Sequence, residues 1–461
     1  MSKNKMSKNK MADGGKSNYR LTRFLYSVDE VKYSLITALL KKVDIDECYY
    51  WAFELYFSGI EKELFDLFYK IHYDFYAERN PKLEGFIKTK KEKWLLDKQV
   101  THIASIVKNM FISDPTPTVF LMRQYIAAFG YPSHVYKNTN HIIHNTIINF
   151  SLEYRNLCSA ISYGRLANIA YDINRLTKRD GGDVVHCVVI DYFETEYGGI
   201  CEGGRKKIKQ LWENREIDDD VHILLAIVVH LMADIKTIKT RQLFAMPLQT
   251  KINEGLMIEN EIINPVYYTL SAKRKYKINH IIGSFKLARD GLPDFLNDNW
   301  MHWEYYATGV PLWNHRVTSL NGKIDHEKRE LWFPGDDVYD NDNDNDNGDD
   351  VREKFYKQYG YELDEQPKEV QYLSLYEINP LCWKVWICDV FGTENNKPDV
   401  KPDVKFDVKP DVKPDVAFDL MLNKLSNMNI CEMNLKGNTE LDIYSIIKNI
   451  PHDFRFIYYT L

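Results

Sequence analysis

The segment from Ser27 to Pro81 contains three runs of helical hydrophobic periodicity, separated by two short breaks. Ser27 and Glu30 have the spacing of a capping box, so the first helix should begin at Val28. Apolar residues then recur every three or four positions as far as Lys42. This spacing places them on one face of a helix.

The next two helices of this segment also have defined ends. Asp44 or Asp46 can cap a helix over 47–57, and Ser58-Gly59 stops it, with the glycine as a left-handed residue. A third helix ends before Pro81, because the residue that precedes a proline avoids the helical region. Its apolar stripe consists of Leu64, Leu67, Phe68, Ile71 and Phe75. Three such helices cannot bury their stripes alone, so the pattern predicts a helix bundle or a helical repeat.

The whole chain divides into regions of different composition. The sequence predicts a mainly α protein, with a HEAT-like helical-repeat or helix-bundle domain over 19–290 and a smaller mixed α/β region over 291–391. Biased segments are expected to lie outside these cores. They are a disordered tail (1–18), an acidic disordered loop inside the mixed region (336–350), a Lys-Pro-Asp-Val linker (392–417) and a small helical tail (418–461).

Three local patterns give further expectations. Helical periodicity predicts a pair of helices over 140–157 and 159–175. Residues 183–193 are ambiguous between helix and strand, and their many β-branched residues favour a strand. Asn321-Gly322 is the dipeptide that two-residue hairpin turns prefer, which predicts a hairpin across 317–325.

Composition narrows the class of protein. Hydrophobic residues make up 44% of the chain, enough for substantial cores, and the net charge is −6. Because 336–350 holds eight carboxylates and no base, the rest of the chain carries +2. A near-neutral fold argues against a dedicated high-affinity duplex-DNA binder. The seven cysteines form no C-x-x-C pair, which is typical of reduced intracellular thiols. We expect neither a secretory signal nor a membrane span.

One glycine-rich segment is similar to a phosphate-binding loop. Gly199 to Lys206 nearly has the required spacing, but Arg205 occupies the lysine position and Lys206 the Ser/Thr position. Without that hydroxyl the loop lacks the usual Mg²⁺ ligand. We therefore expect a glycine loop that caps a basic helix, and neither an enzyme nor a bound cofactor.

Candidate metal ligands are equally incomplete. Asn343, Asn345 and Asn347 have the spacing of half an EF-hand loop, but Lys354 stands where a bidentate Glu is needed. His141 and His144 lie three residues apart without a third ligand of matching spacing. His222 and His230, eight residues apart, are expected to share one face of an apolar helix, with Asp218, Asp219 and Asp220 at its N-terminus. The sequence thus predicts no metal site.

Three clusters of basic residues beside aromatic residues are the candidate nucleic-acid-binding sites. Cations interleaved with aromatic rings suit single-stranded RNA, because phosphates are neutralised while bases stack. Solvated helix faces are the alternative interpretation. The clusters are Lys88, Lys90, Lys91 and Lys93 before Trp94; Arg205, Lys206, Lys207 and Lys209 before Trp212; and Lys273, Arg274, Lys275 and Lys277 around Tyr276.

A short motif suggests a partner-binding helix. Tyr50, Leu55 and Tyr56 fit the loose pattern by which helical peptides dock on cap-binding proteins. In the alternative interpretation, Tyr50 and Leu55 belong to the core of their own amphipathic helix.

Residues 26–87, beginning "YSVDEVKYSLITALLKK", resemble an uncharacterised protein family of large nucleocytoplasmic DNA viruses, mimivirus-like ones in particular. Residues 303–317 ("WEYYATGVPLWNHRV") and 355–371 ("FYKQYGYELDEQPKEVQ") resemble the same family. The resemblance implies a protein of the host cytoplasm, the viral factory or the virion. It brings no catalytic motif and hence no site residue.

The helix pairs with basic edges are also similar in architecture to the HEAT-type middle domain of the translation-initiation scaffold. That likeness implies a non-enzymatic scaffold in viral gene expression, with a cap-binding protein, a helicase and single-stranded RNA as partners. A virion- or capsid-associated structural protein is the alternative, because a surface rich in Tyr and Trp also suits a permanent interface.

Overall fold

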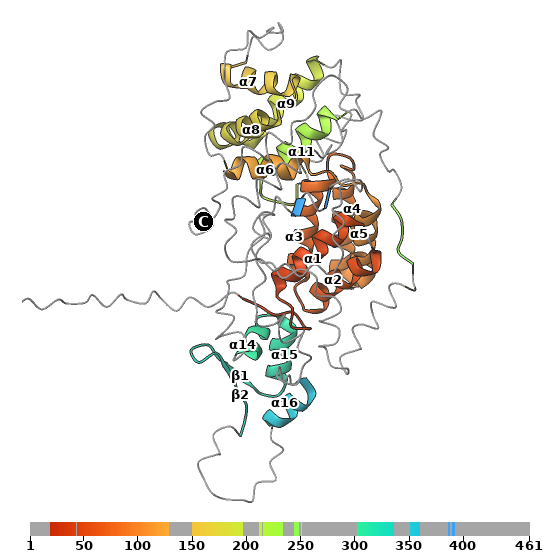
Figure 1. Cartoon of the computed structure of the whole chain (residues 1–461), viewed down its shortest axis with the longest axis vertical. Helices are drawn as coiled ribbons and strands as arrows, with labels where there is room; N and C mark the ends of the chain where they lie inside the picture. The colour runs from red at the N-terminus through yellow and green to blue at the C-terminus, as the bar shows by residue number, and fades with distance from the viewer. Residues whose placement is uncertain are drawn as a thin grey trace, which may run out of the picture.

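The helices of the chain lie in three groups along the longest axis of the molecule, as the computed structural model in Figure 1 shows. The described part of the chain is mainly α-helical with one small two-stranded sheet, which confirms the predicted fold class. The structure describes residues 19–42, 44–128, 150–196, 212–213, 215–233, 244–248, 250, 302–335, 351–359, 386–387 and 390–391.

The middle group contains the three helices predicted from 27–81. Its members are α1 (Val28–Lys41), α2 (Ile45–Phe57), α3 (Glu61–Ile71), α4 (Leu83–Asp97) and α5 (Val100–Ile112). Asp44 caps α2 by accepting a hydrogen bond from the Asp46 N–H. Gly59 has φ +83°, the left-handed conformation expected of a stop. α1 begins at Val28 as predicted, but Ser27 makes no side-chain capping bond, so the capping box itself is wrong.

The third helix does not continue as an α-helix. After Ile71 the chain widens into a π-helix, η1 (His72–Tyr76), in which the Ala77 N–H donates to the His72 carbonyl oxygen. The predicted apolar stripe, including Phe75, is buried. His72 and Asp74 are also buried, which the stripe did not predict. Short π-helices often occur at functional sites, so η1 marks a candidate functional site.

The second group covers one end of the middle group, next to η1. It consists of α6 (Thr118–Ala128), α7 (Leu152–Ser162), α8 (Leu166–Asp180), α9 (Gly182–Glu196) and α11 (Asp220–Met232). The break between α7 and α8 falls at Tyr163-Gly164, where Gly164 has φ +63°, and not at the predicted residue 158.

The strand predicted over 183–193 is wrong, because this segment is helix α9. Val185, Val189 and Phe193 are almost fully buried, and their four-residue spacing lies on one helical face. Packing against α8 and α11 therefore outweighs the β-propensity of the branched residues.

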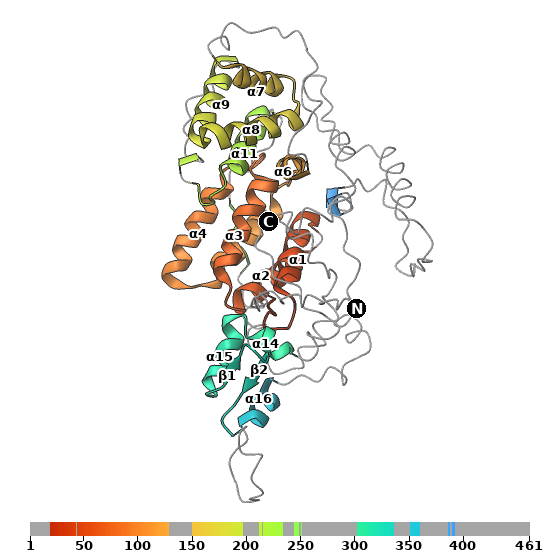
Figure 2. The same cartoon turned by 90° about the vertical axis from the view of Figure 1, so that its left-hand side faces the viewer.

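The third group lies at the opposite end of the long axis (Figures 1 and 2). It comprises α14 (Trp303–Ala307), α15 (Pro311–Ser319), β1 (Lys323–Asp325), β2 (Glu330–Trp332) and α16 (Val351–Tyr359). β1 and β2 are antiparallel, with Lys323 opposite Trp332. The predicted hairpin turn at Asn321-Gly322 is wrong, since 317–319 are helical and the hairpin turn follows Asp325.

Residues 19–27, which precede α1 and fold back in a tight turn that pairs Leu21 with Ser27, join the third group to the middle group; we call this segment the strap. The Leu21 N–H donates to the Tyr306 carbonyl oxygen of α14 at 3.2 Å. The Trp313 indole of α15 donates to the Thr22 carbonyl oxygen, also at 3.2 Å. The strap therefore holds the C-terminal group against the bundle through bonds to its own backbone.

Several predicted features lie outside the described residues. They are the tail 1–18, the acidic loop 336–350, the linker 392–417, the helical tail 418–461, the glycine loop Gly199–Lys206, the pair His141 and His144, and the EF-hand-like run Asn343–Asn347. No helix in the described part of the chain is long and apolar enough to cross a membrane.

Candidate functional site

A buried ionic cluster joins the π-helix to the second group. Asp74 of η1 faces Arg123 of α6 and His222 of α11, and all three side chains are almost fully buried. The Arg123 Nε donates to Asp74 Oδ1 at 2.6 Å, and a second guanidinium nitrogen donates to Oδ2. The His222 Nε2 lies 2.8 Å from Asp74 Oδ1. One carboxylate thus ties three elements together.

The electrostatics of this cluster follow from its burial. Burial alone would raise the pKa of Asp74, but Arg123 and His222 lower it. Burial also lowers the pKa of His222, although the neighbouring Asp74 carboxylate opposes this shift. His72 is fully enclosed beside it, and burial together with His222 lowers the pKa of His72 to about 3. Neither ring nitrogen of His72 has a hydrogen-bond partner among the described residues.

A second polar contact extends from the cluster toward the surface of α4. The Tyr73 ring packs beside the His222 ring, and its hydroxyl donates a hydrogen bond to Glu84 Oε1. Burial raises the pKa of Glu84 to about 7. Beyond Glu84, the Glu216 carboxylate bonds Lys88 at 2.9 Å and Lys91 at 3.2 Å.

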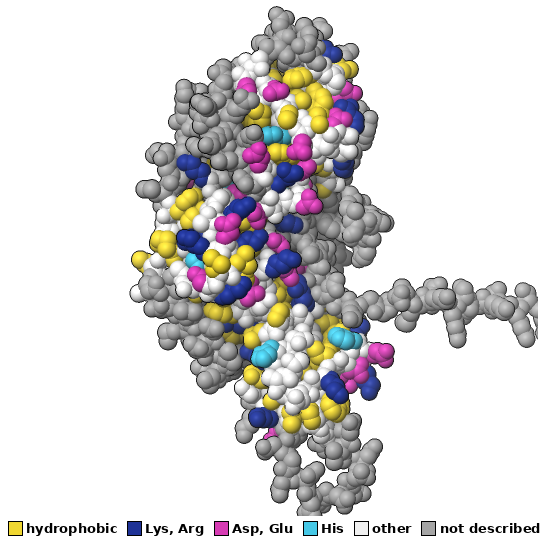
Figure 3. All heavy atoms as spheres, turned by 180° about the vertical axis from the view of Figure 1, so that it is seen from behind, with side chains coloured by type: hydrophobic (Ala, Val, Ile, Leu, Met, Phe, Trp, Pro, Cys, Tyr) yellow, Lys and Arg dark blue, Asp and Glu magenta, His cyan; other side chains and the backbone are white. Residues whose placement is uncertain are grey.

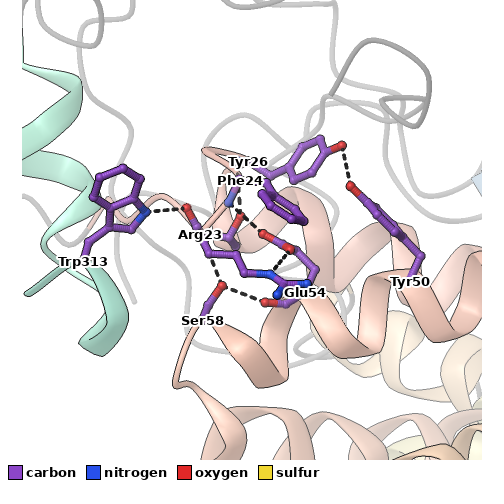
Figure 4. Close-up of polar contacts among 8 residues, drawn as sticks. Arg23, Phe24, Tyr26, Tyr50, Glu54, Ser58 and Trp313 are labelled. Carbon is purple, nitrogen blue, oxygen red and sulfur yellow. Dashed lines mark hydrogen bonds and ion pairs between the residues drawn. The ribbon is translucent and has the colours of Figure 1, made fainter. Parts of the chain in front are cut away.

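A second buried ion pair, shown in Figure 4, fixes the strap to α2. The Arg23 Nε donates to Glu54 Oε2 at 2.8 Å, and the Phe24 N–H donates to Glu54 Oε1 at 3.0 Å. The Ser58 hydroxyl accepts from the Arg23 N–H and donates to the Glu54 carbonyl oxygen. Since Arg23 and Glu54 are 2% and 0% exposed, this contact is part of the interior.

Each of these buried ion pairs holds two separate segments of the chain together, and we call such a pair a joint. Both oxygens of Asp74 and both oxygens of Glu54 already accept hydrogen bonds from groups on other segments. A general base needs a carboxylate oxygen within reach of a substrate proton. The geometry instead suits fixing the angle and register of the elements that carry the charges.

The predicted basic cluster on α4 is only partly available to a ligand. Lys88 and Lys91 are the partners of Glu216. Lys90 is 9% exposed and lies over the Phe86 ring, and burial lowers its pKa. Lys93 is exposed. The sequence pattern could not reveal Glu216, because it lies more than a hundred residues away.

The two tryptophans that accompany these clusters are core residues. Trp94 donates to the Tyr56 hydroxyl at 3.2 Å, and Trp212 donates to Asp183 Oδ1 at 2.8 Å while stacking on His186. Trp94 is 9% exposed and Trp212 4%. Base stacking needs an accessible ring face, so these two indoles do not supply the stacking that the sequence suggested.

The other basic residues cannot be placed. Outside the described residues lie Arg205, Lys206, Lys207, Lys209, Lys273, Arg274, Lys275 and Lys277. Whether the three clusters form one surface therefore stays a prediction.

The residues of the suggested docking motif make contacts inside the fold. Tyr50 and Leu55 are 5% and 1% exposed, and the Tyr50 hydroxyl lies 3.0 Å from that of Tyr26 (Figure 4). The Tyr56 hydroxyl donates to the Lys98 carbonyl oxygen at 2.6 Å. In this structure Tyr50 and Leu55 follow the core interpretation, because their side chains do not reach the surface.

The remaining candidates at α11 behave as structural groups. His222 and His230 share the face of α11 that meets η1 and the residues after it, since the His230 Nδ1 lies 2.7 Å from the Glu78 carbonyl oxygen. Asp219 caps α11 by accepting from the His222 N–H. In the described part of the chain, no three His, Cys, Asp or Glu side chains are grouped so that they could hold a metal ion.

Sequence reasoning missed the charged residues of the joints. A signal was present, because Glu54, Asp74 and Arg123 each interrupt an otherwise apolar stretch of helix. A charge at a core position is expected to have a buried partner, although periodicity does not say which.

Fold and site together define a mainly helical protein whose interior charges hold its layers together. The chain matches no known protein-family model, and neither curated proteins nor solved structures include a significant match to it.

Proposed function

We propose that this chain is a non-enzymatic helical scaffold that binds other proteins. The observation that carries the proposal is the use of its buried charges. Asp74 and Arg123 connect the middle group to the second group, and Arg23 and Glu54 connect the strap to α2. Both oxygens of each carboxylate already accept hydrogen bonds, which leaves none of them open to a substrate. Such pairs specify how elements are arranged, which is what a rigid platform requires.

The α7–α9 layer is the proposed partner-binding surface. It exposes Leu152, Tyr163 and Val184 at 62%, 44% and 47% of their surface. The Arg165 guanidinium lies 5.1 Å from the centroid of the Tyr163 ring at the turn before α8. Tyr and Arg are enriched among the residues that dominate protein interfaces. In Figure 3, hydrophobic side chains gather over this end of the molecule.

The proposed setting is gene expression of a large DNA virus, with a cap-binding protein and a helicase as partners. It is supported by the sequence resemblance of 26–87, 303–317 and 355–371, and by the likeness to a HEAT-type scaffold. RNA is a secondary ligand in this proposal. Lysines that bind phosphates without aromatic rings that stack on bases would give weak, salt-sensitive binding of RNA.

Affinity purification of the tagged chain, with and without nuclease, tests this proposal by mass spectrometry. We expect proteins of the gene-expression machinery that survive nuclease treatment and are reduced by Leu152→Lys. Recovery of capsid or core proteins instead would favour a structural component of the particle. Partners that disappear with nuclease would contradict a protein-binding scaffold.

A further inference from the structure

The last turn of α4 exposes two adjacent leucines. Leu95 and Leu96 are 55% and 87% exposed, whereas Leu83, Ile87 and Trp94 of the same helix are buried. The buried residues of α4 therefore make its contacts with the bundle, and the two leucines form a separate apolar surface. Exposed apolar side chains on adjacent positions cost solubility unless a partner covers them.

The charges around these leucines are balanced. Glu92 and Asp97 are acidic, Lys93 and Lys98 are basic, and all four are exposed. Two of them are held in place: Asp97 by His102 of α5 at 2.9 Å, and Lys98 over the Trp94 ring at 3.7 Å from its centroid. In Figure 3, acidic, basic and hydrophobic side chains are interspersed over this part of the molecule.

This pattern fits a second copy of the same surface better than other ligands. A nucleic acid or a strongly charged peptide would need an excess of one sign. A two-fold symmetric interface must instead be complementary to itself. An antiparallel crossing centred on Leu95 places Glu92 opposite Lys98 of the second copy, and Lys93 opposite Asp97. Every charge then meets its opposite, with leucines between them.

We propose that the chain self-associates through α4, in an antiparallel contact between the Leu95–Leu96 surfaces of two copies. The contact is built on one helix and is small, so the dimer is weak and depends on concentration. It uses α4 and leaves the α7–α9 layer free for other proteins. This inference goes beyond the proposed function, since the scaffold could act as a monomer.

Sedimentation velocity of the full chain from about 1 to 100 μM measures this association directly. We expect a monomer–dimer equilibrium in the wild-type chain. Leu96→Lys should abolish it, because the substitution places two cations at the centre of the contact. The matched control is Leu152→Lys, which adds the same charge at an exposed leucine of α7 and should leave the dimer unchanged.

Charge exchange tests the antiparallel register. Glu92→Lys brings like charges together in a dimer of that variant, and Lys98→Glu does the same with the opposite sign. Each variant alone should associate about tenfold more weakly, because two symmetric pairs become repulsive. An equimolar mixture restores both pairs, so association should recover in the mixture. Circular dichroism confirms that each variant is folded.

Three results would overturn the proposal. The first is a wild-type chain that is monomeric over the whole concentration range. The second is equal weakening by Leu96→Lys and Leu152→Lys. The third is a mixture of the two charge variants that associates no better than either alone. None of these bears on partner recovery, which depends on Leu152, so the dimer and the scaffold can fail separately.

Discussion

The Arg123 Nε donates a 2.6 Å hydrogen bond to Asp74 Oδ1 in a part of the protein where both residues are less than 5% exposed. This bond connects α6 to the π-helix, and His222 adds α11 on the same carboxylate. Removing one member of a buried pair leaves the other charged and unsolvated. The cluster should therefore be far more sensitive to substitution than the ion pairs of the surface.

Asp74→Asn should lower the free energy of unfolding by about 3–5 kcal/mol, because Arg123 stays buried without its anion. Urea denaturation of the full chain measures the effect. The matched control is Lys42→Ala, which removes an exposed 2.9 Å pair with Asp114 and should cost at most about 1 kcal/mol. Similar losses in the two variants would show that the cluster is not a joint.

The buried histidines predict a loss of stability in mild acid. Burial lowers the pKa of His72 to about 3 and also lowers that of His222. Between the unfolded value near 6.5 and the folded value, the unfolded chain binds protons that the folded protein excludes. The free energy of unfolding should therefore fall as pH drops below about 6.5, and be fully restored above it.

His72→Phe separates this effect from general acid denaturation. The substitution keeps an aromatic ring, and neither imidazole nitrogen has a described hydrogen-bond partner to lose, so the variant should be about as stable as the wild type at pH 7. Below about pH 6 it should lose about 1.4 kcal/mol less per pH unit, because one fewer proton is taken up on unfolding. An unchanged pH slope would be the contrary result.

Glu84 has the opposite pH dependence. Burial raises its pKa to about 7, so the folded protein holds a proton that the unfolded chain releases above about pH 4.5. Its contribution is thus favourable in acid and is lost as pH rises toward 7. Glu84→Gln should gain about 2–3 kcal/mol over the wild type at pH 8 and nothing at pH 4. Thermal melts of both proteins at the two pH values show whether the gain has this dependence.

Gly59→Ala should weaken the packing of the third group. Gly59 has φ +83°, and a β-carbon there would lie 2.8 Å from the β-carbon of Pro311 in α15. Gly181 has φ +87° with nothing within 4 Å of such a carbon. Both alanine variants incur backbone strain, but only Gly59→Ala should add an overpacking cost of about 1–3 kcal/mol. Equal changes in melting temperature would contradict the close approach of α15.

The sequence could predict the helical class and most of α1–α3, because each of these helices buries a continuous apolar stripe. Local signals also mark their ends, such as the Asp44 cap before α2 and Gly59 after it. It could not predict α9 as a helix, since the β-branched residues of 183–193 pack on a face supplied by α8 and α11. The π-helix could not be predicted either, because Phe75 is buried in it just as it would be in a continuous α-helix.

The candidate site depended on distant partners. Nothing near Lys88 or Lys91 in the chain reveals their pairing with Glu216. The joint of Asp74 with Arg123 likewise connects residues about fifty positions apart. Local spacing could identify basic or acidic residues, but which of them neutralise one another is decided by the packing of separate helical groups.

The most direct test of the account compares the partners of the wild-type chain with those of Asp74→Asn/Arg123→Met. This pair of substitutions removes both buried charges and leaves an amide acceptor for His222, so the fold should be retained. Affinity purification and mass spectrometry should then recover the same proteins with both chains, since the cluster acts only as a joint. A double variant that stays folded but loses its partners would contradict that account, because Asp74 and Arg123 would then do more than hold the fold together.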